Sequence, residues 1–150
     1  MAFVAADDSD RARDLVAVLE GVAELGDGGT TGRSVTAAVG LPVCTSLIHF
    51  AEGHYDRVVD TLLPIQLRLH ELGGSHAQRD VVERTLLEAA IRAHRTDLAR
   101  ALANQRLGVR ESSMYAWSKL SEVLAGSGDQ SGATEAKARA GALAAKIRLG

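Results

Sequence analysis

The chain has 150 residues and a formal net charge of −2 at pH 7, with 24% charged residues. That length suffices for one domain with a buried core, and the balanced charge gives no electrostatic basis for binding nucleic acid or an anionic membrane. Hydrophobic residues make up 46% of the chain but aromatic residues only 3%, so Ala, Leu and Val carry the apolar fraction and favour packed helices over sheets.

Cysteine usage and the lack of a long apolar stretch indicate a soluble, cytoplasmic protein. The single cysteine, Cys44, excludes an intramolecular disulfide framework and cannot supply a set of thiolates for zinc. The N-terminus, MAFVAADDSD, has neither the basic segment nor the long apolar segment of a secretory signal. No window approaches the roughly 18 apolar residues that a membrane span needs.

Apolar residues at helical spacing predict the first two helices. The first covers residues 9–25, with Ser9 as its N-cap. Residues 26–40, which open with GDGGTTGRS, are predicted to form a flexible Gly-rich connection. The second helix is predicted to begin at Pro42, because proline suits the first position of a helix, and to end at Gly53.

The remaining helices are predicted to follow one another at short intervals. The third runs from Tyr55 to about Leu72, and because its apolar register persists through Pro64, the proline is expected to kink the helix rather than end it. The other predicted boundaries are Ser75 before the fourth helix, the turn at His94 and Arg95, Thr96 as cap of the fifth, Ser112 or Ser113 at the start of the sixth, and residues 133–149 for the last.

The turn residues Gly53, His94 and Gly128 align the helices as repeated pairs. The interval from His94 to Gly128 is 34 residues, the period of a tetratricopeptide repeat, and the interval from Gly53 to His94 is 41 residues. Trp117 stands at the tryptophan position of that repeat. Compact residues recur five positions after each turn, where the helices of a repeat approach closely: Val58, Ala99 and Ala133.

This periodicity predicts an all-α fold over a single domain, residues 1–150. The expected architecture is an α-solenoid of tetratricopeptide-type helix pairs with about seven helices, namely three repeats and a preceding half-repeat. Helix 9–25 would be the second helix of that half-repeat, so its apolar stripe lacks its usual partner and must be covered in another way.

Motifs along the middle of the chain also carry a family resemblance. In the order GHY, LLP, LGGSHAQRDV, TLLEAAIRA and LARAL, roughly residues 41–125 resemble the C-terminal portion of the tetratricopeptide repeat protein 38-like family. The chain departs from that pattern at Val82, His94 and Glu111, where an aromatic residue, glycine and proline are expected. The resemblance implies an α-solenoid. Because the family's biochemical role is poorly defined, it implies no particular chemistry.

The segment GGSHAQRD, residues 73–80, reads largely as the end of one helix and the start of the next. Glycines at its start suit a left-handed helix stop. Ser75 and Gln78 have the spacing of a capping box, in which each side chain accepts a hydrogen bond from the other residue's backbone N–H. Asp80 near a helix start is favoured by the helix dipole.

His76 and Arg79 are not explained by capping, and two interpretations of them stay open. They are three residues apart, so they project from one side of the first helical turn. Arg79 has the chemistry to bind a carboxylate or phosphate, with His76 as donor or acid–base group. Alternatively, Arg79 pairs with Glu83 or anchors the preceding helix, and both residues are structural.

No metal, cofactor or catalytic arrangement is predicted. His49 and His54 are five residues apart across a turn, and His70 and His76 are six apart, so neither pair matches two ligands on one helix face. Cys44 lies on an apolar face, where cysteine usually behaves as a small hydrophobe. The sequence therefore favours a binding role over an enzymatic one, without deciding between them.

We expect a non-enzymatic binding or scaffold module whose first helices line a concave groove for a protein or peptide partner. Self-association, as a homodimer through the N-terminal helix or the groove, would cover the apolar stripe of helix 9–25. The candidate groove residues are Leu47, Phe50, Ile91, Ser118 and Glu122, and the candidate ligand- or partner-binding residues are His49, His76, Arg79, Asp80, Arg84 and Glu88.

A second hypothesis is a small helical protein with a small-molecule pocket or an accessory catalytic role. Its pocket would form where the Pro64 kink, GGSHAQRD and His49 converge. The two hypotheses differ in what surrounds His49, His76 and Arg79. An enclosed cavity lined by these side chains and a carboxylate would favour a ligand, whereas capping bonds and an anchored Arg79 would favour the scaffold.

Overall fold

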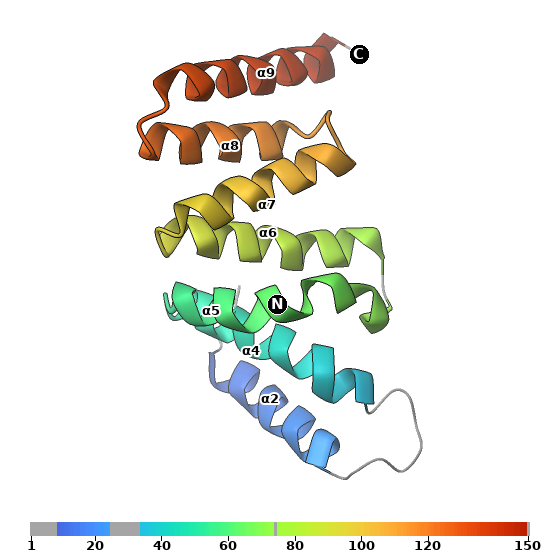
Figure 1. Ribbon diagram of the computed structural model, residues 1–150. Helices are drawn as coiled ribbons and strands as arrows, with labels where there is room; N and C mark the ends of the chain where they lie inside the picture. The colour runs from blue at the N-terminus through green and yellow to red at the C-terminus, as the bar shows by residue number, and fades with distance from the viewer. Residues whose placement is uncertain (1–8, 25–33, 74, 150) are drawn as a thin grey trace. The chain divides into compact units, whose positions relative to one another are not determined.

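Helices account for all the regular structure in the part of the chain that the structure describes. The computed structural model describes residues 9–24, 34–73 and 75–149 (Figure 1). The all-α prediction is confirmed for these residues, and a solenoid of tetratricopeptide type stays a prediction. No helix among them is both long enough and apolar enough to cross a membrane. The helical segments are α2 (Ser9–Glu24), η1 (Thr36–Gly40), α4 (Leu41–Ala51), α5 (Tyr55–Leu62), η2 (Leu63–Leu72), α6 (His76–Arg92), α7 (Thr96–Val109), α8 (Met114–Gly126) and α9 (Gln130–Leu149).

The chain divides into two compact units, where the sequence predicted a single domain. Unit 1 is Met1–Ala89 and unit 2 is Ala90–Gly150, with the boundary inside α6. In unit 1, α2 packs on η1 and α4, α4 packs on α5, and η1 packs on η2. In unit 2, α8 packs on both α7 and α9.

Aliphatic side chains fill the interior of each unit, as the composition predicts. Fully buried examples are Val39, Val58, Val59 and Leu62 in unit 1 and Ala99, Ala103 and Ala116 in unit 2.

The predicted connection of residues 26–40 is wrong for its last part. Thr36–Gly40 forms a π-helix that runs directly into α4, so Pro42 lies inside a continuous helical segment instead of opening it. Val39 is fully buried, and the Cβ position of Gly40 faces the side chain of Leu72 at 3.7 Å. Packing against η2 therefore holds this stretch helical although it follows a Gly-rich sequence. Residues 26–33 lie outside the described part of the chain.

Pro64 changes the type of helix rather than only kinking it. The α-helical geometry ends at Leu62, and Leu63–Leu72 is a 3-10 helix. Proline has no N–H for the bond to the fourth preceding carbonyl, and its ring crowds that carbonyl, so the tighter helix resolves the conflict. The apolar register changes with it: Leu69 is buried, but Leu72 is 39% exposed although the α-helical spacing predicts it on the buried face.

The three turns aligned in the sequence have the same backbone conformation. Gly53, His94 and Gly128 all have positive φ, at 79°, 56° and 88°. In each turn the next residue donates its N–H to the carbonyl five residues earlier, at 2.8 Å from His54, 2.9 Å from Arg95 and 3.0 Å from Asp129. This is the Schellman pattern that ends a helix. The compact residues predicted five positions after the turns are all buried: Val58, Ala99 and Ala133.

The positive φ in the Schellman turns predicts that removing a glycine destabilises the protein and that introducing one stabilises it. We expect Gly128→Ala to lower the free energy of unfolding by about 1 kcal/mol, because a Cβ disfavours positive φ. His94→Gly is expected to raise it by about 0.5 kcal/mol by removing the same strain. Urea unfolding followed by circular dichroism measures both changes.

Gly108 provides the control for these substitutions. It lies inside α7 without positive φ, and a Cβ there meets no atom within 4 Å. Gly108→Ala is therefore expected to stabilise the helix by about 0.5 to 1 kcal/mol. Equal effects of alanine at Gly108 and Gly128 would show that backbone conformation does not decide these positions.

Candidate functional site

The segment GGSHAQRD forms the helix stop and start that its sequence predicts. Gly73 has φ of 68°, and Gly74 lies outside the described residues. The Ser75 N–H donates to Oε1 of Gln78 at 2.7 Å, and the Gln78 N–H donates to Oγ of Ser75 at 3.3 Å. The capping box is confirmed, and it uses both side chains for helix structure.

Arg79 and His76 contact each other and the preceding helix end. Arg79 donates from Nη1 to the Gly73 carbonyl at 3.2 Å, which ties the start of α6 to the end of η2. Its Nη2 lies 3.1 Å from Nδ1 of His76. Since a guanidinium can only donate, Nδ1 is the acceptor and His76 carries its proton on Nε2. These bonds support the structural interpretation of both residues.

The other candidate residues lie on three helices. On α6, Arg84 is 4.0 Å from Asp80, while Glu88 and Ile91 are half-buried. On α4, Leu47 and Phe50 are half-buried, and the Phe50 ring packs edge-on against Tyr55 with ring centroids 5.4 Å apart. On α8, Ser118 and Glu122 are exposed. A groove over these helices would span both units, so the predicted groove stays a prediction.

His49 is grouped with residues of its own turn and not with GGSHAQRD. Among the described residues, its polar neighbours are Glu52, with Oε2 3.6 Å from Nδ1 of His49, and His54, with ring centroids 5.8 Å apart. Arg13 of α2 donates to the other oxygen of Glu52 at 2.7 Å. That hydrogen bond is the largest cause that lowers the pKa of the Glu52 carboxyl below its usual value.

Cys44 agrees with its prediction as a small apolar residue. It is half-buried on α4. Burial raises the pKa of its thiol above the usual value, so the thiolate that a nucleophile requires is disfavoured.

Unit 2 contains a pocket that the sequence does not predict. Its volume is about 550 Å³, within the range of ligand-binding pockets. The end of α7, the turn before α8, the start of α8 and the second half of α9 form its walls, and we call it the α8–α9 pocket. The residues that line it are Val109, Arg110, Glu111, Ser112, Trp117, Arg139, Ala142, Leu143 and Lys146.

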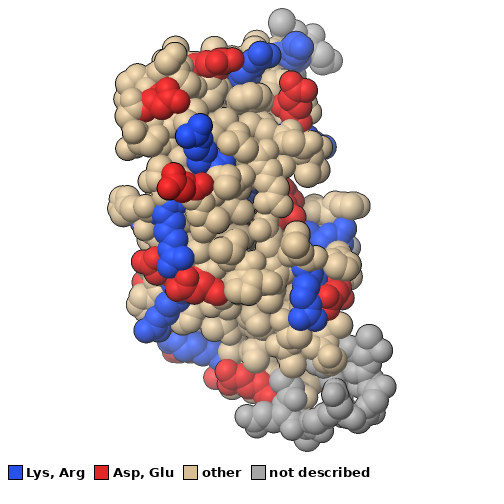
Figure 2. Space-filling view, in the orientation of Figure 1, with Lys and Arg blue, Asp and Glu red and all other residues tan. Residues whose placement is uncertain are grey.

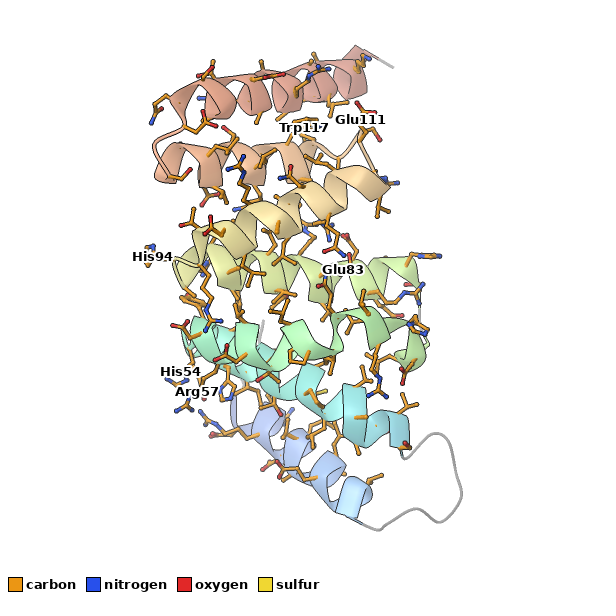
Figure 3. All side chains as sticks on the ribbon, in the orientation of Figure 1. His54, Arg57, Glu83, His94, Glu111 and Trp117 are labelled. Carbon is orange, nitrogen blue, oxygen red and sulfur yellow. The ribbon has the colours of Figure 1, made fainter. Side chains whose placement is uncertain are left out.

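Helix geometry and local hydrogen bonds place these side chains around the α8–α9 pocket. The four contributions of α9 are spaced three, four and seven residues from Arg139, so they occupy one helix face. Ser113 caps α8 through the Ala116 N–H, which donates to its Oγ at 3.2 Å. Trp117 donates from Nε1 to the Glu111 carbonyl at 2.8 Å, and this bond fixes the turn before α8 against the indole. Figure 3 shows Trp117 between α8 and α9, beside Glu111.

The pocket has an excess of positive charge. Arg110, Arg139 and Lys146 line it with a single carboxylate, that of Glu111. The three cationic side chains make no hydrogen bond or ion pair with any described residue. On the face that Figure 2 displays, charges of both signs alternate with uncharged areas, so attraction to anions would be local. The arrangement offers cationic donors beside an apolar wall of Val109, Trp117 and Leu143.

Comparison with known proteins adds no family assignment. No model of a known protein family matches the chain. No solved structure matches it at a significant level. The resemblance to the tetratricopeptide repeat protein 38-like family therefore rests on the motifs in the sequence and stays a prediction.

Proposed function

We propose that the protein is a non-enzymatic binding module that holds an acidic, partly apolar segment of a partner polypeptide in the α8–α9 pocket. The observation that carries this proposal is the set of three cationic side chains, Arg110, Arg139 and Lys146, without a partner among the described residues. Arg13, Arg68 and Lys119 are paired with carboxylates. Arg57, Arg100 and Lys137 also have no partner among the described residues, so the distinguishing feature of the three pocket cations is that they surround one concavity. Unpaired cations around a concavity are the chemistry that carboxylates of a partner would complete.

A polypeptide suits this pocket better than a compact metabolite. Most of the lining side chains are exposed, with Val109 at 88%, so a bound molecule would keep one side in solvent. An extended peptide places an apolar side chain against Trp117 and Leu143 while neighbouring carboxylates reach Arg139 and Lys146. Glu111 opposes part of that attraction, which gives one end of the pocket a different preference.

The wider proposal is a helical-repeat scaffold that self-associates. The identical Schellman turns at Gly53, His94 and Gly128 support repeated helix pairs of tetratricopeptide type. On α2, Leu15 is 46% exposed and Val18 is 63% exposed, so an apolar surface remains for a second copy of the chain. Native mass spectrometry measures whether the chain forms a dimer.

A fluorescent peptide tests the binding function. The probe contains two leucines flanked by aspartates, and the matched probe carries lysines in place of the aspartates. We expect the acidic probe to bind and the basic probe not to bind, with affinity falling as salt is added, because the attracting cations are solvent-exposed. Fluorescence anisotropy measures both affinities. Equal binding of the two probes, or none of either, would refute the proposed peptide site.

Glu111 provides a second check with the opposite sign. Glu111→Gln removes the carboxylate that opposes the acidic probe, so binding is expected to strengthen by about two- to fivefold, the effect of one exposed charge. The variant keeps the Glu111 carbonyl that accepts from Trp117, so the turn is preserved. Tighter binding of inorganic phosphate than of the acidic probe would instead favour a small anionic ligand.

A further inference from the structure

The turn between α4 and α5 places two imidazoles and a carboxylate together. His49 lies in the last turn of α4, Glu52 caps that helix, and His54 follows the left-handed Gly53. The His54 N–H donates to the His49 carbonyl at 2.8 Å, so the Schellman turn itself fixes the two backbones. Figure 3 shows His54 at this turn. The corresponding pairs in the other turns are Ala90 with Arg95 and Leu124 with Asp129.

The distances within this cluster suit a metal ion. Oε2 of Glu52 lies 3.6 Å from Nδ1 of His49 and 3.3 Å from Nδ1 of His54. Ligand atoms of the three residues all lie within 4.8 Å of one another. Ligands at about 2.0 to 2.1 Å from a tetrahedral ion lie about 3.3 Å apart, so small side-chain rotations would complete three corners of a tetrahedron.

An unsatisfied atom points to the same conclusion. Nδ1 of His49 is buried and has no hydrogen-bond partner, which is a costly state for a polar nitrogen. Oε2 of Glu52 lies 3.6 Å from this nitrogen, too far for a hydrogen bond. A cation between the two atoms would satisfy both.

Arg13 orients the carboxylate in the way that metal sites require. It donates from Nη2 to Oε1 of Glu52 at 2.7 Å and so leaves Oε2 toward the two imidazoles. Carboxylate ligands of metals are commonly held by such a hydrogen bond. The positive charge of Arg13 opposes a cation, so the site is expected to bind moderately rather than tightly.

We propose that His49, Glu52 and His54 bind one divalent transition-metal ion of the zinc class. Two imidazoles and one carboxylate favour zinc, cobalt, nickel or copper over magnesium or calcium, which prefer oxygen ligands. Three protein ligands leave the fourth position to water, and the 52% exposure of the His54 side chain leaves the cluster accessible to solvent. The ion would hold the α4–α5 turn closed across the Schellman motif.

The test uses the full chain without a histidine tag, titrated with Co²⁺ and then with Zn²⁺. We expect one equivalent of Co²⁺ to bind with the visible absorption of tetrahedral cobalt, and Zn²⁺ to displace it. Long-range ¹H–¹⁵N spectra are expected to show Zn²⁺ on Nδ1 of His49 and His54. Zn²⁺ should also raise the unfolding temperature of the protein.

Variants at exposed positions keep the proposal falsifiable. His54→Ala and Glu52→Gln are each expected to weaken binding by about tenfold or more while the helix content is unchanged. His76→Ala removes an exposed histidine outside the cluster and is expected to bind metal like the wild type. Absence of stoichiometric binding to the wild type, or equal binding by His54→Ala, would overturn the proposal.

Discussion

Leu62→Ala is expected to lower the free energy of unfolding by about 2 to 5 kcal/mol. Leu62 is the last residue of α5 and is only 1% exposed. Truncation removes the transfer free energy of the side chain and leaves a cavity where α5 meets η2. The helix changes type directly after this residue, so the rigid Pro64 limits how far the backbone can move to fill the cavity. Urea unfolding monitored by circular dichroism measures the loss.

Leu67→Ala is the matched control, because it removes the same atoms five residues along the same helical segment. Leu67 is 80% exposed, so its truncation is expected to change the free energy of unfolding by less than about 0.5 kcal/mol. Five residues are about 140° apart around an α-helix, so the helical spacing already places Leu62 and Leu67 on different faces. A loss at Leu67 comparable to that at Leu62 would contradict the exposed position of the Leu67 side chain on η2.

The features that sequence predicts well here are those with a local physical cause. Helical periodicity and glycine stops locate α6 from Ser75 onward and α8 from Ser113, because capping depends on neighbouring residues. The alignment of Gly53, His94 and Gly128 succeeds for the same reason: each needs positive φ within a short motif. The predicted family and repeat architecture concern packing over longer distances and stay predictions.

The failures occur where packing or a competing hydrogen bond overrides a local signal. The sequence predicts Thr96 as the cap of α7, but its hydroxyl donates to the His94 carbonyl at 3.5 Å, and Arg95 takes the N-cap position without a side-chain cap. The last helix begins at Gln130, before the predicted start at Ala133, because Asp129 accepts the Gly132 N–H at 2.9 Å. A local pattern can favour either capping arrangement, and only the fold selects one.

In the candidate sites, too, the sequence predicts local features but not the contacts that depend on the fold. The spacing of His49 and His54 across a turn matches no pair of ligands on one helix face, so it predicts no metal site, but the Schellman turn brings both imidazoles close to Glu52. The α8–α9 pocket was missed because Arg110 lies far along the chain from Arg139 and Lys146. The spacing of Arg139 and Lys146 indicates a cationic helix face, because residues seven apart lie on the same side of a helix. Which segment they face is a tertiary property.

The double charge reversal Arg139→Glu with Lys146→Glu is expected to weaken binding of the acidic probe by about 100-fold, since each exposed contact turns from attraction to repulsion. The same variant is expected to bind the lysine probe, which the wild type does not. Both residues are exposed and have no partner among the described residues, so their replacement leaves no buried group unpaired. Fluorescence anisotropy with both probes measures this exchange of preference.

A second double variant separates the pocket from the overall charge of the protein. Arg100→Glu with Lys137→Glu changes the net charge by the same amount at exposed positions of unit 2 outside the pocket. Neither residue lines the pocket, and an exposed charge without direct contact to the probe contributes little at physiological salt, so the acidic probe is expected to bind this variant nearly as well as the wild type. Comparable losses in the two double variants would mean that net charge, and not the arrangement around Trp117, attracts the peptide.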